Sequence, residues 1–397
     1  MLILDIDRFR QVNFSLGYKA GDILLEQVAI RLQTLEHCPC IVQAGDDEFL
    51  LFLHASTQAE LTQTIQETQY MFNQPFTVMK QECYLNVSMG ISQFTMAPGT
   101  MEQALMQADH ALLAAKHSGK NKLIAYHPSH SLRYISRIQM ETELRKAIYD
   151  NQLILYYQPR LELSSGSIIC LEALVRWNHP IQGIIPPNEF IPIAEECGLI
   201  IPLGEWVLRE ACRQKMKWTE EGILDYQIAV NISPHQFQED AFSDKVIQII
   251  EQTGINPTCL EFEITESSIM HNMDATIAIL EKLCKKGVSI SIDDFGIGYS
   301  SLNYLKQFPI HCLKIDRSFV KNIHNNQDDW AITNAIIDLG YALHMQVVAE
   351  GVEEMSQLEI LKGTTCTTIQ GFLLSPPVSV HELEQSFHLH DNRPVIS

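Results

Sequence analysis

The sequence predicts two folded regions, a small α+β domain and, after it, a (β/α)8 barrel of the TIM type. The 397 residues suggest two or three domains, or one barrel with a smaller partner. In the first part, helical patterns lie among strand-like runs that suit a mostly antiparallel sheet. In the second part, eight strand-like runs are separated largely by helical patterns, as a barrel of this kind requires.

The composition is that of a globular protein, with 46% apolar and 8% aromatic residues. The formal charge of −20 argues against a nucleic-acid polymer as partner, because phosphate backbones bind surfaces rich in lysine and arginine. It is compatible with carboxylates that bind divalent cations. No apolar run reaches the ~20 residues of a membrane-spanning helix. The ten cysteines lack zinc-ligand spacing, so we expect reduced thiols. The N-terminus lacks the basic leader of a signal peptide, and we expect a cytoplasmic, bacterial protein.

The first region begins with a buried strand at residues 1–4. A Gly45-Asp46-Asp47 turn between two apolar strands predicts a hairpin, because such turns need residues that tolerate positive φ. The other expected elements are strands ending at 44 and covering 49–53, 76–78 and 84–91, and helices at 22–35, 58–72 and 101–116.

A connecting helix is predicted next, because apolar residues recur at roughly helical spacing from 132 to 149. We place the domain boundary near residues 128–140. The expected organisation is a first domain at 1–127, a connecting helix at 128–147, a barrel at 148–390 and a tail at 391–397.

The second region alternates between strand and helix. The expected strands are 153–159, 168–177, 227–232, 260–265, 288–293, 312–316, 346–349 and 367–372, and the expected helices include 206–218, 244–252, 274–285, 330–343 and 355–361. A doubly wound open sheet would also fit this alternation. No Gly-rich dinucleotide fingerprint follows any of these strands, however, which favours the barrel.

Polar residues that can bind a metal or a phosphate lie at or near the ends of almost all these strands. They are Glu172, Asn231, Glu263, Glu266, Asp293, Asp294, Lys314, Glu350 and Gln370. The carboxyl ends of barrel strands meet at one face, so these side chains should form one site. Their oxygen donors suit Mg²⁺ or Mn²⁺. Such a set can hold two cations about 3.5–4 Å apart for displacement at phosphorus, with Lys314 ordering water or neutralising charge.

Simpler interpretations remain open for individual residues. Strand-end acids can cap helices or pair with lysines, and Arg176 can form a surface salt bridge instead of a phosphate contact. The Gly-rich segment 296–301 is either a mobile loop that closes over the metals or a plain tight turn. Such residues occur at seven successive strands, which favours a common site.

The second region contains a series of motifs in a fixed order. They are Leu171-Glu-Ala-Leu-Val-Arg-Trp, the strand with Asn231, Glu263-Ile-Thr-Glu266, Asp293-Asp-Phe-Gly-Ile-Gly-Tyr-Ser-Ser-Leu, Leu313-Lys-Ile-Asp, Ala349-Glu-Gly-Val-Glu and Gln370-Gly-Phe. Together they resemble the EAL family, bacterial phosphodiesterases that linearise cyclic di-GMP. The resemblance implies a TIM-type barrel, two Mg²⁺ or Mn²⁺ ions, cyclic di-GMP as substrate and pGpG as product.

The resemblance also implies a role for each site residue. The metal ligands would be Glu172, Asn231, Glu263, Asp293 and Asp294. The catalytic group would contain Lys314, with Glu350 organising metal and water and Glu266 anchoring the loop after the Asp pair. Substrate contacts are expected from Gln158, Arg176 and Gln370, the last of which also organises metal and water. Ile297 stands where the family usually has threonine, which predicts altered loop stability or dimer coupling with activity retained.

The first region resembles the GGDEF domain, the diguanylate cyclase module often fused ahead of EAL domains. The likeness rests on Leu4-Asp-Ile-Asp-Arg-Phe, Asn13, Gly21-Asp22, Gly45-Asp-Asp-Glu-Phe, Ala108-Asp109, Ala115-Lys116 and Gly119-Lys-Asn121. It implies a vestigial GTP site, in which Asp5 and Asp47 hold metal, Asn13 and Asp22 contact guanine, and Lys116 and Lys120 contact phosphates.

Two departures from the GGDEF pattern predict that cyclase activity is lost. Asp46 replaces a glycine of the signature, which crowds the turn and adds negative charge beside the phosphates. The helices that precede the first strand in that family, with their Asp-x-Leu-Thr-Gly-Leu-x-Asn-Arg segment, are absent from this sequence, so we expect a truncated domain. Its expected role is a GTP-binding regulatory module or a structural scaffold that pairs chains.

Three functional hypotheses follow. The first is metal-dependent hydrolysis of cyclic di-GMP, and the second is a catalytically silent cyclic di-GMP receptor that signals through a partner protein. Silent relatives typically lack the first glutamate, an aspartate of the pair or the lysine, and none of these is missing here. The third, synthesis of cyclic di-GMP by the first region, is the weakest. We also expect a homodimer, with GTP as an allosteric ligand.

Overall fold

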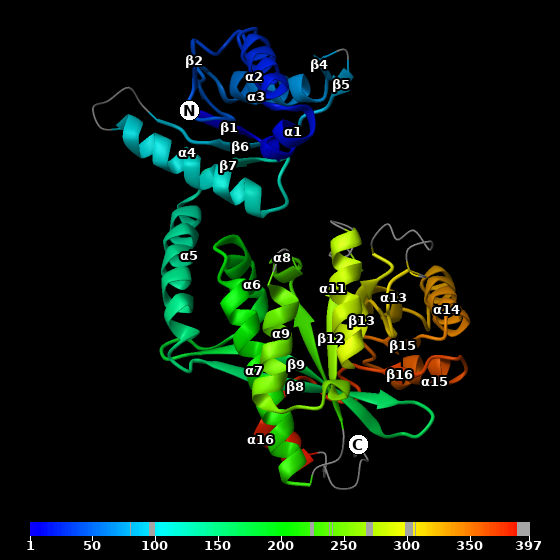
Figure 1. Cartoon of the computed structure of the whole chain (residues 1–397). Helices are drawn as coiled ribbons and strands as arrows, with labels where there is room; N and C mark the ends of the chain where they lie inside the picture. The colour runs from blue at the N-terminus through cyan, green and yellow to red at the C-terminus, as the bar shows by residue number, and fades with distance from the viewer. Residues whose placement is uncertain are drawn as a thin grey trace. The chain divides into compact units, whose positions relative to one another are not determined.

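The computed structural model describes residues 1–79, 81–94, 100–222, 226–237, 239, 241–266, 273–297, 305 and 307–386 (Figure 1). The chain divides into two compact units, Met1–Gln139 and Met140–Ser397. The division falls within the helix α5 (Pro128–Ala147). The predicted tail at 391–397 lies outside the described residues.

The first unit is built on a five-stranded sheet, counted over its described residues, with the strand order β2-β3-β1-β6-β7. Its elements are β1 (Leu2–Ile6), α1 (Phe9–Leu16), α2 (Tyr18–Leu32), β2 (Cys40–Gln43), β3 (Glu48–Phe52), α3 (Gln58–Phe72), β4 (Phe76–Val78), β5 (Gln81–Cys83), β6 (Val87–Ile91), α4 (Thr100–His117) and β7 (Leu123–Ala125). The β2–β3 hairpin spans the predicted Gly-Asp turn.

Strand β1 is fully buried at the centre of this sheet and pairs antiparallel with β3 and β6. Its side chains alternate between two apolar layers, because successive residues of a strand point to opposite faces. Leu2 and Leu4 pack in the layer that contains Leu24 of α2, whereas Ile3 packs with Ala108 of α4. The predicted α+β sandwich is therefore present. Strand β7, which pairs parallel with β6, was not predicted.

The second unit is a closed barrel with outer helices. Its elements are β8 (Leu153–Glu162), β9 (Ile168–His179), β10 (Gly183–Ile185), α6 (Pro187–Glu196), α7 (Ile200–Glu220), β11 (Gln227–Ile232), α8 (Pro234–Phe237), α9 (Phe242–Thr253), the 3₁₀ helix η1 (Pro257–Cys259), β12 (Leu260–Thr265), α11 (Met273–Lys286), β13 (Ser289–Phe295), β14 (Cys312–Ile315), α13 (Arg317–Val320), α14 (Gln327–Ala342), β15 (Gln346–Ala349), α15 (Met355–Lys362), β16 (Thr368–Ile369), β17 (Val378–Ser379) and α16 (Val380–Ser386). The eight predicted barrel strands all have counterparts in this set.

The barrel closes through strand β8. From β9 the strands follow the order β11, β12, β13, β14, β15 and β16, and β8 joins β16 back to β9. Strands β9 and β11 to β16 run parallel, but β8 is antiparallel to both of its neighbours. Residues 163–167 join β8 directly to β9, and a parallel connection would need a crossover of a dozen or more residues. The first strand is thus reversed relative to a regular (β/α)8 barrel.

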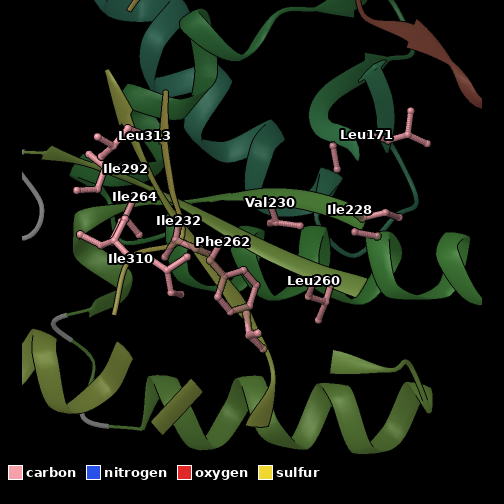
Figure 2. Packing of buried hydrophobic residues seen from close by; sticks show 14 of the residues in the cluster. Leu171, Ile228, Val230, Ile232, Leu260, Phe262, Ile264, Ile292, Ile310 and Leu313 are labelled. Atoms are coloured by element: carbon pink, nitrogen blue, oxygen red, sulfur yellow. The ribbon is translucent and has the colours of Figure 1, made fainter. Parts of the chain in front are cut away.

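The barrel strands separate apolar from polar side chains by their two-residue period. On β12, Leu260, Phe262 and Ile264 belong to the large apolar core (Figure 2), which also contains Ile249 of α9 and Leu283 of α11. The alternate residues Glu261 and Glu263 are equally buried but make polar contacts with other strands. The apolar set therefore packs between sheet and helices, and the polar set lies inside the barrel.

Candidate active site

The predicted site residues come together at one end of the barrel. The parallel register places Asn231 of β11 beside Glu263 of β12, and Thr265 of β12 beside Asp293 of β13. Glu350 directly follows β15. These side chains lie at the carboxyl ends of neighbouring parallel strands, the end at which barrels of this type form their sites.

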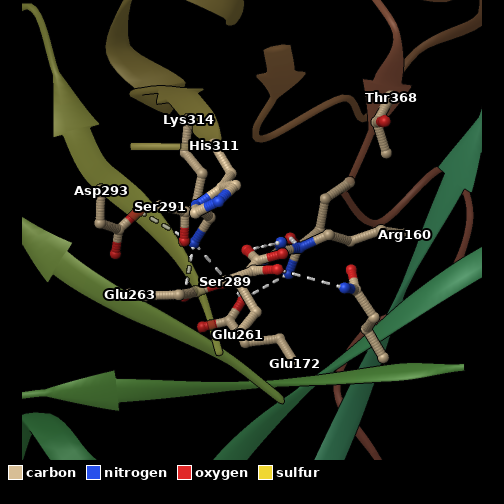
Figure 3. Close-up of polar contacts among 12 residues, drawn as sticks. Arg160, Glu172, Glu261, Glu263, Ser289, Ser291, Asp293, His311, Lys314 and Thr368 are labelled. Carbon is tan, nitrogen blue, oxygen red and sulfur yellow. Dashed lines mark hydrogen bonds and ion pairs between the residues drawn. The ribbon is translucent and has the colours of Figure 1, made fainter. Parts of the chain in front are cut away.

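Lys314 of β14 is the centre of the cluster (Figure 3). Its Nζ lies 2.7 Å from Glu263 Oε2, 2.9 Å from Asp293 Oδ1 and 2.6 Å from Glu350 Oε1, and 3.8 Å from Glu172 Oε2. The residue is 1% exposed. Burial alone would lower its pKa, but the surrounding carboxylates outweigh burial and raise the pKa. Lys314 is therefore positively charged at neutral pH.

Asp293, Asp294 and Glu350 form a group whose ligand oxygens all lie within 4.8 Å of one another. Burial, with repulsion from Asp293 and Asp316, raises the pKa of Asp294 to about 6. Burial also raises the pKa of Glu350 to about 7, and Lys314 only partly offsets this rise. Lys314 instead holds the pKa of Asp293 below its usual range. Carboxyl groups crowded in this way repel one another unless a cation lies between them.

Asp294 has an unusual backbone, with a φ of 54° at the end of β13. This left-handed conformation is uncommon for a residue other than glycine, and aspartate is among the side chains that tolerate it best. This conformation ends the regular alternation of side chains between the two faces of β13, so that the consecutive residues Asp293 and Asp294 can both join the cluster. Such local strain is typical of functional sites.

A chain of amide hydrogen bonds holds Glu172 of β9. Asn231 Nδ2 donates to Glu172 Oε1 at 2.7 Å, and Gln370 Nε2 donates to Glu172 Oε2 at 2.6 Å. Gln370 Nε2 also donates to Gln158 Oε1 at 3.1 Å, and Gln158 Nε2 donates to the Ser375 carbonyl at 3.0 Å. Gln158 and Gln370 are both buried. Their amides are thus bonded to protein groups, and their predicted contacts with substrate stay predictions.

Two buried charged residues of this region were missed by the sequence reasoning. Arg160 of β8 donates from Nη1 to Glu261 Oε1 at 2.6 Å, from Nε to Gln370 Oε1 at 2.9 Å, and forms an ion pair with Glu263. The pair holds the pKa of Glu261 below its usual range despite burial. Their place in the strand pattern could have revealed them, because Arg160 lies two residues after Gln158, and Glu261 two residues before Glu263, on the same faces.

The start of the predicted loop is attached to β12. Gly296 N donates to Glu266 Oε2 at 3.3 Å, the anchoring contact expected of this glutamate. Gly296 has a φ of 106°, and an added Cβ would lie 2.9 Å from the Phe319 ring. Ile297 is exposed. Residues 298–301 of the predicted mobile loop lie outside the described residues.

Arg176 lies four residues after Glu172 on the same side of β9 and is half-buried. Its guanidinium carbon is 5.4 Å from the centroid of the Tyr156 ring, and its Nη1 donates to the Val175 carbonyl at 2.9 Å. Cation–π contact of this kind orients a guanidinium without neutralising it. Arg176 can therefore still attract an anion.

The donor set fits a divalent metal. Every candidate ligand offers oxygen, namely Glu172, Asn231, Glu263, Asp293 and Asp294. Glu350, which was expected to organise metal and water, lies in the same cluster. Oxygen-only sets suit Mg²⁺ or Mn²⁺. In the structure, Lys314 supplies positive charge at three of these carboxylates, Glu263, Asp293 and Glu350.

The predicted GTP residues of the first unit are only partly brought together. Lys116 Nζ lies 2.6 Å from Asp5 Oδ2 and forms an ion pair with it. Burial raises the pKa of Asp5, and the negative charge of Asp47 raises it further. A predicted metal ligand and a predicted phosphate contact therefore neutralise each other. Asn13 packs against Gly21, the neighbour of Asp22. Asp22 and Lys120 are exposed.

Curated relatives share both units. Residues 141–377 match the family model described as EAL domain, and residues 1–122 match that described as diguanylate cyclase, GGDEF domain. The chain is 39% identical over 384 residues to the bifunctional diguanylate cyclase/cyclic di-GMP phosphodiesterase MucR of Pseudomonas aeruginosa, covering 96% of this chain and 56% of MucR. It is 34% identical over 386 residues to the cyclic di-GMP phosphodiesterase PdeR of Escherichia coli, covering 97% of this chain and 58% of PdeR. The chain thus spans little more than half the length of these relatives.

A solved structure gives the same result for the barrel. The phosphodiesterase PaMucR in complex with c-di-GMP is 46% identical, with a TM-score of 0.60, over 62% of this chain and 99% of that one. Over the part of the chain that the structure describes, no helix is long and apolar enough to cross a membrane. The EAL model covers more than half of the chain, and PaMucR is matched almost completely. The chain therefore belongs to the EAL domain family, with a GGDEF domain ahead of the EAL domain.

Proposed function

We propose that this protein is a metal-dependent phosphodiesterase that hydrolyses cyclic di-GMP to linear pGpG. The observation that carries the proposal is the carboxylate cluster at the carboxyl end of the barrel, with Asp293, Asp294 and Glu350 within 4.8 Å of one another. The names of MucR and PdeR, and the ligand of PaMucR, support cyclic di-GMP as the substrate.

The metal ligands would be those of the donor set. Two Mg²⁺ or Mn²⁺ ions held there would polarise the phosphate and activate a water molecule. Glu172 is prepared for such a role, because Asn231 and Gln370 fix both of its oxygens. A carboxylate that is already oriented loses little freedom when it binds.

The chain's own residues would handle charge and protons. The ammonium group of Lys314, central among the carboxylates, would neutralise charge that develops on the phosphate. Glu350, whose carboxylate lies beside those of Asp293 and Asp294, would accept a proton from water. Arg176 would contact the substrate phosphate from its position over Tyr156.

The GGDEF domain would have a regulatory or structural role without cyclase activity. The Asp5–Lys116 ion pair and the acidic Asp46 in the turn both act against a bound metal–triphosphate. GTP would remain a candidate allosteric ligand, and the chain would form a homodimer. Hydrolysis rates followed across a GTP titration test the first idea, and sedimentation tests the second. A rate that does not change with GTP would remove the regulatory role.

The proposal is tested by incubating the full chain with cyclic di-GMP and Mg²⁺ or Mn²⁺, and separating the products by chromatography. We expect pGpG with the wild-type protein and none with Glu172→Gln, a variant that keeps the shape of the side chain. Binding is measured in parallel by calorimetry. Wild-type protein that binds cyclic di-GMP but releases no pGpG with either metal would instead be a silent receptor.

A further inference from the structure

Arg160 is a second buried cation in the barrel, distinct from Lys314. It lies on β8, the reversed strand, and is 1% exposed. A buried guanidinium is costly unless its N–H groups are paired. Its three nitrogens contact three side chains, Glu261 and Glu263 of β12 and Gln370 after β16, as Figure 3 shows for the glutamates.

The contact with Gln370 fixes the orientation of an amide. Arg160 Nε donates to Gln370 Oε1 at 2.9 Å, so the amide oxygen must face the guanidinium. The amide nitrogen of Gln370 then faces the opposite way and donates to Glu172 Oε2 at 2.6 Å. A flipped amide would bring Nε2 against the N–H of Arg160 and its oxygen against the carboxylate. Arg160 therefore sets the orientation of Glu172 through one intermediate side chain.

The contact with Glu263 acts directly. Arg160 forms an ion pair with Oε1 of this glutamate, whereas Lys314 Nζ lies 2.7 Å from Oε2. One oxygen of Glu263 is thus held by Arg160, and the other points toward the cluster. Glu261 Oε1 accepts from Nη1 at 2.6 Å, a nitrogen separate from the two that contact Glu263 and Gln370.

We propose that Arg160 is a positioning residue for the metal centre, which orients Glu263 directly and Glu172 through Gln370 without contacting the substrate. The inference rests on the proposed metal centre. Groups that orient a metal ligand in this way typically change metal affinity by about 10–100-fold when they are replaced. The guanidinium is required because it reaches Glu263 and Gln370 from two separate nitrogens, whereas lysine has a single nitrogen that cannot occupy both positions.

The test is the Mn²⁺ affinity of the full chain, measured by calorimetry without nucleotide and so independent of activity. Arg160→Lys keeps the positive charge but loses the planar guanidinium with its separate N–H donors. This variant should bind Mn²⁺ at least about tenfold more weakly than wild type. Glu261→Gln is the matched control, since it weakens a contact of the same guanidinium but leaves those to Glu263 and Gln370. It should change Mn²⁺ affinity less than about threefold, even where it lowers thermal stability.

Two outcomes would overturn the inference. One is wild-type Mn²⁺ affinity in folded Arg160→Lys, and the other is equal loss in Arg160→Lys and Glu261→Gln, which indicates a general structural role. If Arg160→Lys does not fold, Gln370→Met replaces it, and unchanged Mn²⁺ affinity in that variant also overturns the inference. Failure of wild-type protein to bind Mn²⁺ would instead contradict the metal centre of the proposed function.

Discussion

Lys314→Met should destabilise the metal-free barrel, and this change tests how the site is held together. The side chain is 1% exposed and its ammonium lies within 3 Å of oxygens on Glu263, Asp293 and Glu350. Methionine keeps much of the volume but removes the charge. The carboxylates would then repel one another in a site that is only partly open to water, since Glu263 is buried and Asp293 and Glu350 are less than one-fifth exposed.

The size of the effect follows from burial. Removing one partner of a buried ion pair typically costs about 3–5 kcal/mol. Lys314 lowers the pKa of Glu350, which is about 7 in its presence, so the pKa rises further in Lys314→Met. Glu350 can then take up a proton and relieve part of the repulsion, and we expect the lower end, about 3 kcal/mol, at pH 8. For a domain of this size, each kcal/mol lowers Tm by about 2–4 °C, which gives about 6–12 °C.

Thermal unfolding in EDTA at pH 8 measures this effect, with Lys285→Met as the matched control. Lys285 pairs with Glu281 at 3.3 Å, but both side chains are exposed, so its loss should cost less than about 1 kcal/mol. Saturating Mn²⁺ should restore most of the lost stability of Lys314→Met, because the ions replace the missing positive charge. The reasoning is refuted if Lys314→Met and Lys285→Met have the same Tm in EDTA.

Three further predictions concern protons, backbone and the GGDEF domain. Asp294 and Glu350, with pKa values of about 6 and 7, gain protons as the pH falls, and these protons compete with the metal. Calorimetry should therefore show Mn²⁺ binding that is about tenfold or more weaker at pH 6 than at pH 8. Equal affinities at the two pH values would contradict the assignment of these two carboxylates to the metal site. Gly296→Ala should lower the free energy of unfolding, measured in urea, by about 1–3 kcal/mol, because φ is 106° and the new methyl group meets the Phe319 ring. Wild-type stability in this variant would contradict the close approach of Gly296 to Phe319. Asp46→Gly removes a negative charge beside the predicted phosphate site of the GGDEF domain. A fluorescence titration should then show a GTP affinity raised by up to about fivefold. An unchanged GTP affinity would argue against nucleotide binding beside this turn.

The strand pattern was enough to predict the barrel, because apolar runs of strand length recur between helical segments and end in polar residues. It did not predict the reversal of β8, although residues 163–167 leave no room for a crossover helix. The short connection was the available signal. The same period-two logic separates Phe262 in the core from Glu261 and Glu263 inside the barrel.

The sequence indicates which strand-end side chains lie near one another, but not which contacts they make. Strand ends identify which residues meet, yet the stagger between strands decides which atoms touch, and no local pattern encodes it. The placement of Lys314 against three carboxylates and the amide contacts of Gln370 therefore required the structure. Arg160 was missed because a single charged residue in a strand is, taken alone, more typical of an exposed face.

The central claim is that the carboxylate cluster supports attack of water on a cyclic di-GMP phosphodiester. The most direct measurement is the mass of the product formed by the full chain with Mn²⁺ in water enriched with oxygen-18. We predict linear pGpG that carries one heavy oxygen in its terminal phosphate, formed with Mn²⁺ and not in EDTA. Intact cyclic di-GMP after incubation with Mn²⁺, or pGpG without the heavy oxygen, would contradict the account.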